Sequence, residues 1–130
     1  MKIKIITTAR IVFGLAFLIF GLNGFFNFMP TPAPSAQMGE LLGAFAKTGY
    51  FFPMIKSIET ICGLLILSNI LAPLAVVLIA PILVGITSIH IFLDPQGMPL
   101  MILLHLFHAL LIWGYWNYFK SIFTKKAVIS

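Results

Sequence analysis

Apolar residues along the chain gather into four long runs, which short polar or proline-rich stretches separate. The runs cover residues 5–28, 52–71, 73–93 and 99–119. Each has about the 20 residues that a helix needs to cross a hydrocarbon core roughly 30 Å thick, since a helix rises about 1.5 Å per residue. The pattern therefore predicts an all-α membrane protein, a bundle of four transmembrane helices. No repeat or second domain is evident, so residues 1–130 are expected to form one domain.

The connections between the runs restrict how the helices can pack. Residues 30–35 are rich in proline and should be extended, whereas residues 37–49 could form a short helix on the membrane surface. The links at residues 68–73 and 94–98 are short, which makes the second, third and fourth helices antiparallel neighbours. Pro81 lies inside the third run and should bend or loosen that helix.

Composition supports a membrane location and excludes several functions. The 130 residues are 61% hydrophobic and 8% charged, which leaves too little polar surface to cover a water-soluble globule. Cys62 is the single cysteine, so an intramolecular disulfide and a CxxC redox pair are excluded. The basic residues stand at the ends of apolar runs without a stripe of exposed aromatics, which argues against nucleic-acid binding.

The basic residues also predict the orientation of the chain in the membrane. One group precedes or enters the first run and consists of Lys2, Lys4 and Arg10. The other group follows the fourth run and consists of Lys120, Lys125 and Lys126. An even number of spans puts both groups on one face of the membrane, and the positive-inside rule makes that face cytoplasmic. Both termini are therefore predicted to be cytoplasmic.

Polar residues inside the runs are the candidate functional groups, because polar side chains in a membrane are costly and usually face the protein interior. They form pairs three or four residues apart, so each pair shares one helix face. The pairs are Asn23 with Asn27, Lys56 with Glu59, His90 with Asp94, and His105 with His108. All are predicted near the outer side, where they could surround a polar pocket that opens outward.

Simpler interpretations of these residues stay open. Lys56 could merely neutralise Glu59, Asp94 could cap a turn, and each histidine could bond to a neighbouring carbonyl. A metal site would need the four residues of suitable type to converge: Glu59, His90, His105 and His108. His-x-x-His on one helix is a weak signal without a third ligand, so no metal is predicted.

Small residues on the first two runs are expected to serve packing. Gly14, Gly21 and Gly24 follow nearly the same stripe of the first helix as Arg10, and Gly63 lies one turn after Glu59. Such residues let two helices approach closely in a membrane.

Several segments resemble the DoxX family of small bacterial membrane proteins. They are residues 9–14, 20–30 and 58–67, together with residues 90–99, which resemble a bacterial subgroup. The resemblance implies a four-helix bundle in the bacterial cytoplasmic (inner) membrane. It also implies that Arg10 matches the family's arginine in the first helix and Glu59 its acidic residue in the second.

The resemblance and the polar pairs suggest two functions, and whether the chain is an enzyme is left open. In the first, an oxidoreductase-associated subunit binds a quinone or another small ligand: Glu59 exchanges protons, His105 or His108 donates, and the asparagines orient the ligand. No haem, flavin or iron–sulfur signature is present, so electrons would come from a partner subunit or a bound ligand. In the second, the chain is a non-catalytic subunit of a larger membrane complex or a homo-oligomer.

Overall fold

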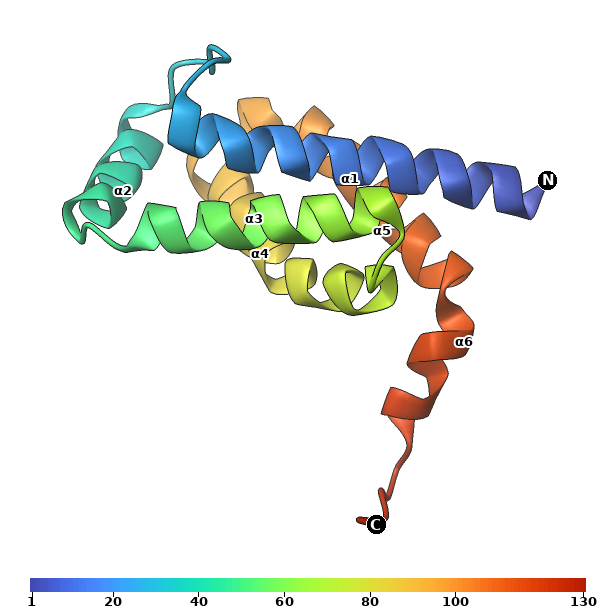
Figure 1. Ribbon diagram of the computed structural model, residues 1–130. Helices are drawn as coiled ribbons and strands as arrows, with labels where there is room; N and C mark the ends of the chain where they lie inside the picture. Colours follow the sequence, from blue (N-terminus) through green and yellow to red (C-terminus); the bar gives the residue numbers. More distant parts are fainter.

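Four long helices account for most of the computed structural model, which describes residues 1–130 (Figure 1). They are α1 (Lys2–Phe26), α3 (Phe51–Ser68), α4 (Ala72–Leu93) and α5 (Met98–Gly114). Four shorter helices complete the fold: α2 (Ala36–Lys47), η1 (Pro95–Gly97), α6 (Trp116–Phe119) and η2 (Lys120–Phe123). No strand is present. Four helical segments are long and apolar enough to cross a membrane, which confirms the predicted all-α fold with four spans.

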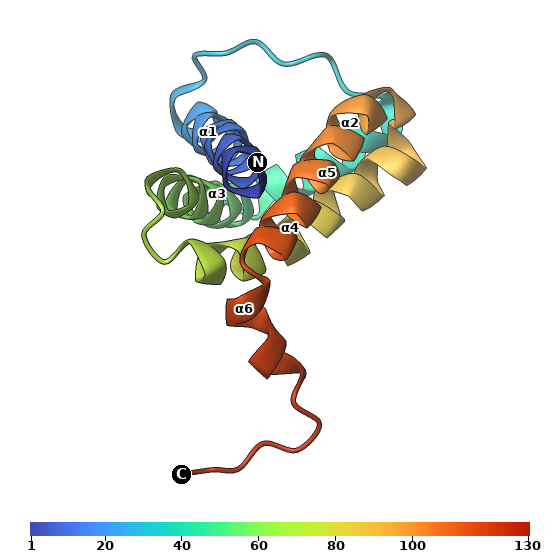
Figure 2. The same ribbon diagram turned by 90° about the vertical axis from the view of Figure 1, so that its right-hand side faces the viewer.

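The long helices form two pairs, α1 with α3 and α4 with α5. Helix α1 packs most extensively against α3, α3 packs against α4, and α5 packs against α1 and α4. Figure 2, a view from the end where the chain begins, shows the two pairs diverging from one another. Each helix thus has two neighbours.

Glycines allow the backbones of α1 and α3 to touch. A Cβ atom added at Gly14 would lie 2.6 Å from the backbone nitrogen of Leu67 and 3.0 Å from the carbonyl oxygen of Gly63. A Cβ at Gly21 would lie 2.6 Å from the backbone nitrogen of Thr60. These distances are shorter than van der Waals contact, so only glycine fits. The glycines of α1 therefore lie against α3, Gly14 and Gly21 against its backbone and Gly24 against the Lys56 side chain.

Arg10 binds the carboxyl-terminal end of α3. Its Nη1 donates to the carbonyl oxygen of Ile66 at 3.0 Å and also to that of Leu67. The last carbonyls of a helix have no partner within the helix and carry partial negative charge, so a guanidinium satisfies them well. This contact explains why a charged residue is tolerated in the first span.

Replacing Arg10 with methionine is expected to destabilise the bundle by about 2 kcal/mol, because the carbonyls at the end of α3 lose a charged donor. Arg10→Lys keeps one donor and should cost less. The unfolding midpoint in mild detergent, followed by tryptophan fluorescence, measures both changes. Equal stability of the methionine variant and the wild type would contradict the assigned contact.

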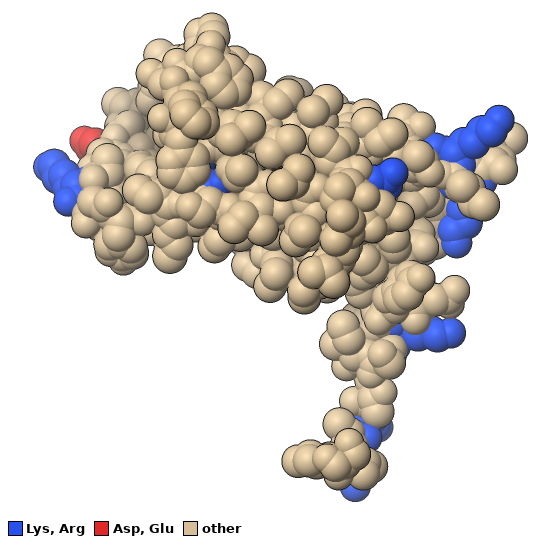
Figure 3. All heavy atoms as spheres, in the orientation of Figure 1, with Lys and Arg blue, Asp and Glu red and all other residues tan.

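The start of α1 and the end of α5 lie at the same end of the bundle as the Arg10 contact. The hydroxyl of Tyr115 donates to Oδ1 of Asn69 at 2.5 Å, and burial raises the pKa of Tyr115, which keeps this donor protonated. Nζ of Lys2 lies 4.4 Å from the ring centroid of Trp113. Figure 3 shows basic side chains gathered at this end and along the carboxyl-terminal segment. Its location on the cytoplasmic side stays a prediction.

Packing is dense at this end and loosens toward α2. The buried residues of α4 all lie at or before Leu83: Ala72, Ala75, Val76, Ile79 and Leu83. Those of α3 all lie at or after Glu59: Glu59, Cys62, Gly63 and Ile66. Because α3 and α4 are antiparallel, these parts lie side by side, and neither α3 before Glu59 nor α4 after Leu83 has a fully buried residue.

The structure refines the sequence-based expectations for the helices. The fourth long helix ends at Gly114 and not at Phe119, because the backbone leaves helical geometry at Tyr115 and α6 turns away from the bundle (Figure 1). The expected short helix at residues 37–49 is present as α2. Pro81 lies inside α4, which stays helical from Ala72 to Leu93.

Candidate functional site: a cavity beneath α2

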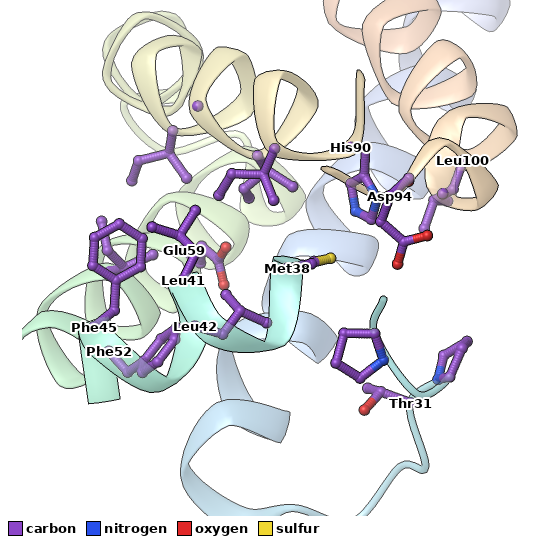
Figure 4. Close-up of a pocket in the computed structure, with 18 of the residues that line it drawn as sticks. Thr31, Met38, Leu41, Leu42, Phe45, Phe52, Glu59, His90, Asp94 and Leu100 are labelled. Atoms are coloured by element: carbon purple, nitrogen blue, oxygen red, sulfur yellow. Dashed lines mark hydrogen bonds between the residues drawn. The ribbon is translucent and has the colours of Figure 1, made fainter. Parts of the chain in front are cut away.

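A cavity of about 970 Å³ lies where α3 and α4 separate, and α2 covers it (Figure 4). Its walls are the 31–34 segment, α2, the first half of α3, the second half of α4, and η1 with the start of α5. Most of the lining is apolar, including Leu42, Phe45 and Phe52. Polar side chains enter it at Lys56, Glu59, His90 and Asp94. A mainly apolar hollow with a few convergent polar groups is the usual form of a small-molecule site.

Contacts at both of its ends hold α2 over the cavity. Oγ of Ser35 accepts from the backbone nitrogen of Met38, which caps the helix, and donates to the carbonyl oxygen of Leu93 at 2.6 Å. The backbone nitrogen of Ser35 donates to Oδ2 of Asp94 at 3.3 Å. At the other end the ring of Phe45 stacks on that of Phe51, with centroids 4.0 Å apart. Asp94 therefore ties the cover to the end of α4.

Lys56 and Glu59 form a salt bridge in the cavity wall. Nζ of Lys56 lies 2.9 Å from Oε2 of Glu59, whose residue is 1% exposed. Oε1 of Glu59 makes no hydrogen bond to the protein. A second cavity of about 190 Å³, lined by residues of α1, α3, α4 and α5, is bordered by the same two side chains. The pair therefore stands between the covered cavity and the centre of the bundle.

His90 presents one ring nitrogen to the cavity side of α4. Its Nδ1 lies 3.1 Å from the carbonyl oxygen of Asp94. Because a carbonyl only accepts, Nδ1 carries the proton, and in the neutral ring Nε2 is then an acceptor. A Cβ at Gly97 would overlap the His90 ring, so glycine is needed at that position. His90 can accept a hydrogen bond from a ligand hydroxyl.

The other two histidines do not line this cavity. Nε2 of His108 donates to the carbonyl oxygen of Val76 at 2.9 Å, in the densely packed half of α4. Nε2 of His105 lies 2.8 Å from Oγ1 of Thr87, whose own proton goes to the carbonyl oxygen of Leu83. Both imidazoles bridge α4 and α5. With α5 ending at Gly114, His108 also falls past the middle of its helix and not in the outer half.

The two asparagines stabilise the carboxyl-terminal end of α1. The amide of Asn23 exchanges two hydrogen bonds with the backbone of Met29, at 2.7 and 3.1 Å. Asn27 ends the helix in the left-handed conformation, with φ of 48°. Neither residue lines the cavity. The structure thus brings together Lys56, Glu59, His90 and Asp94, and leaves four predicted pocket residues elsewhere: Asn23, Asn27, His105 and His108.

Sequence reasoning did not anticipate the apolar walls of the cavity. On α2 they are Met38, Leu41, Leu42 and Phe45, and on α4 they include Pro81 and Gly85. The three- and four-residue spacing on α2 was the available signal, since it marks one apolar face of a surface helix. No three residues among His, Cys, Asp and Glu lie close enough together to hold a metal ion.

These features define a small polytopic membrane protein, a four-helix bundle with a covered cavity at one end. The chain belongs to the DoxX family, whose model matches residues 5–92. The match runs from α1 into the end of α4 and includes Arg10, Lys56, Glu59 and His90. Comparison with curated proteins and with solved structures gives no match. The family resemblance expected from the sequence is confirmed.

Proposed function

We propose that this protein binds a quinone-class molecule in the cavity beneath α2 and acts as an accessory subunit of a membrane oxidoreductase. The observation that carries the proposal is the Lys56–Glu59 pair, held at 2.9 Å in the wall of a mainly apolar cavity. Charged groups at such depth are expensive and usually mark a functional site in membrane proteins. The cavity volume lies within the range of small-molecule sites.

The lining matches the chemistry of a quinone head group. A quinone carbonyl accepts hydrogen bonds, and Nζ of Lys56 is a donor at the wall. A quinol hydroxyl donates, and both Oε1 of Glu59 and Nε2 of His90 are acceptors without a partner in the protein. The rings of Phe45 and Phe52 supply apolar surface for a planar ring. Electrons would pass to or from the ligand through a partner subunit.

Affinity purification from a mild detergent extract tests the proposal, with mass spectrometry of the bound quinones and proteins. The wild type should retain a quinone, and Glu59→Gln should retain about tenfold less, because the amide keeps the shape but loses the charge and proton exchange. Glu40→Gln is the matched control, since Glu40 is an exposed carboxylate on α2 outside the cavity lining. That variant should match the wild type.

The same experiment addresses the alternative function, a non-catalytic subunit of a membrane complex. A stoichiometric protein partner that Glu59→Gln retains, in the absence of any bound quinone, would support assembly and contradict quinone binding. Equal quinone content in the wild type, Glu59→Gln and Glu40→Gln would contradict the role given to the carboxylate.

A further inference from the structure

The covered cavity has a polar part and an apolar part at different depths. Lys56, Glu59 and His90 lie within about 12 Å of the helix ends that meet α2, at 1.5 Å per residue. The cavity continues along α4 to Pro81, roughly 18 Å from the end of that helix at Leu93. This deeper part lies at the level of the hydrocarbon core, and its lining carries no charged side chain.

One face of α4 forms the deeper wall. Pro81, Gly85 and Ile89 are four residues apart and line the cavity together. Pro81 and Gly85 are also exposed, so no neighbouring helix covers this part of the wall. A Cβ atom at Gly85 would meet nothing within 4 Å, which leaves a furrow in the helix surface where a side chain would otherwise stand.

Helix α2 covers the cavity on another side. The Ser35 contacts with Leu93 and Asp94 and the Phe45–Phe51 stack fix α2 across it. The flank at Pro81 and Gly85 has no such cover. A ligand dissolved in the bilayer would therefore reach the polar groups from the side, through hydrocarbon, with any apolar chain still in contact with lipid.

We infer that the cavity takes a ligand with an apolar chain, whose head lies at Lys56–Glu59 and whose chain lies in the furrow at Pro81 and Gly85. The inference rests on the proposed function and adds the ligand class and a residue that selects for the chain. Gly85 keeps the furrow open. A larger residue there fills the space of the chain and leaves the head group's contacts intact.

Two probes with one head group test this inference: the ubiquinone head without a chain, and its decyl derivative. Dissociation constants are measured by titration calorimetry on protein in lipid nanodiscs, with empty nanodiscs as the blank for partitioning. The wild type should bind the decyl probe more tightly than the head alone. Gly85→Leu should weaken binding of the decyl probe about tenfold, or about 1.4 kcal/mol, and leave binding of the head alone unchanged. Glu59→Gln should weaken the binding of both probes.

Ser88→Leu is the matched control, because Ser88 is exposed on α4 but does not line the cavity. It should bind both probes as the wild type does. If leucine at position 85 disturbs folding, Gly85→Ala provides a smaller obstruction with the same selectivity for the chain. Equal wild-type affinity for the two probes, or an equal effect of Gly85→Leu on both, overturns the chain subsite while leaving head-group binding intact. Failure of the wild type to bind either probe overturns the proposed function itself.

Discussion

Gly63→Leu is expected to unfold the bundle, with a loss of about 4 kcal/mol or more in the free energy of unfolding. A Cβ atom at Gly63 would lie 2.9 Å from the carbonyl oxygen of Gly14 and 2.9 Å from Cα of Leu18, and nearer still to the backbone nitrogen of Leu18. These are backbone atoms of α1, which cannot rotate away as a side chain could. The two helices must separate, and Arg10 then loses the carbonyls at the end of α3.

Unfolding by sodium dodecyl sulfate in bicelles, followed by tryptophan fluorescence, measures this effect. Gly43→Leu is the control, because a Cβ at Gly43 meets nothing within 4 Å. It should show no loss of stability or a small gain, since leucine favours helix more than glycine does. A Gly63→Leu protein that unfolds at the wild-type detergent concentration would show that α1 and α3 do not touch through their backbones.

The second large effect is expected from Lys56→Met, which removes the partner of a buried carboxylate while keeping the length of the side chain. Breaking a buried ion pair on one side costs about 3 kcal/mol or more, because the remaining charge has no compensation. The same detergent unfolding measures the loss. Glu59 is 1% exposed and Lys56 is its one hydrogen-bond donor in the protein, so the carboxylate loses its only partner.

The double variant Lys56→Met/Glu59→Gln separates the charge effect from packing. It should recover most of the stability lost in Lys56→Met, because the amide carries no charge. If the double variant is as unstable as Lys56→Met, the uncompensated charge of Glu59 is not the cause of the lost stability.

The sequence predicts the long helices well because their apolar runs have the length of a membrane span. The helix boundaries agree to within a few residues except at the end of the fourth helix, where Trp116 and Phe119 continue the apolar pattern after the helix has stopped. Gly114 fits there against Ile6 of α1, and that packing is invisible to a periodicity argument. Phe119 still packs into the core, but α6 turns away from the bundle (Figure 1), so the apolar residues of this segment do not extend the span.

The candidate site is only partly predictable, for a different reason. Spacing shows that two polar residues share a helix face but not what that face meets. The partners of His105 and His108 are a threonine hydroxyl and a backbone carbonyl of α4, which depend on how α4 and α5 pack. Lys56 and Glu59 were predictable as a pair because both partners stand on one helix. Helix α2 forms the cover. Its polar residues made its apolar face difficult to recognise from the sequence.

The glycine contact between α1 and α3 makes this part of the molecule more rigid than the rest. Two helices joined backbone to backbone have little freedom to slide or tilt against one another, whereas α4 has no fully buried residue after Leu83 to hold it in place. Widening of the hollow must therefore come from displacement of α2 and the far part of α4. The α1–α3 pair serves as the fixed frame against which those parts shift.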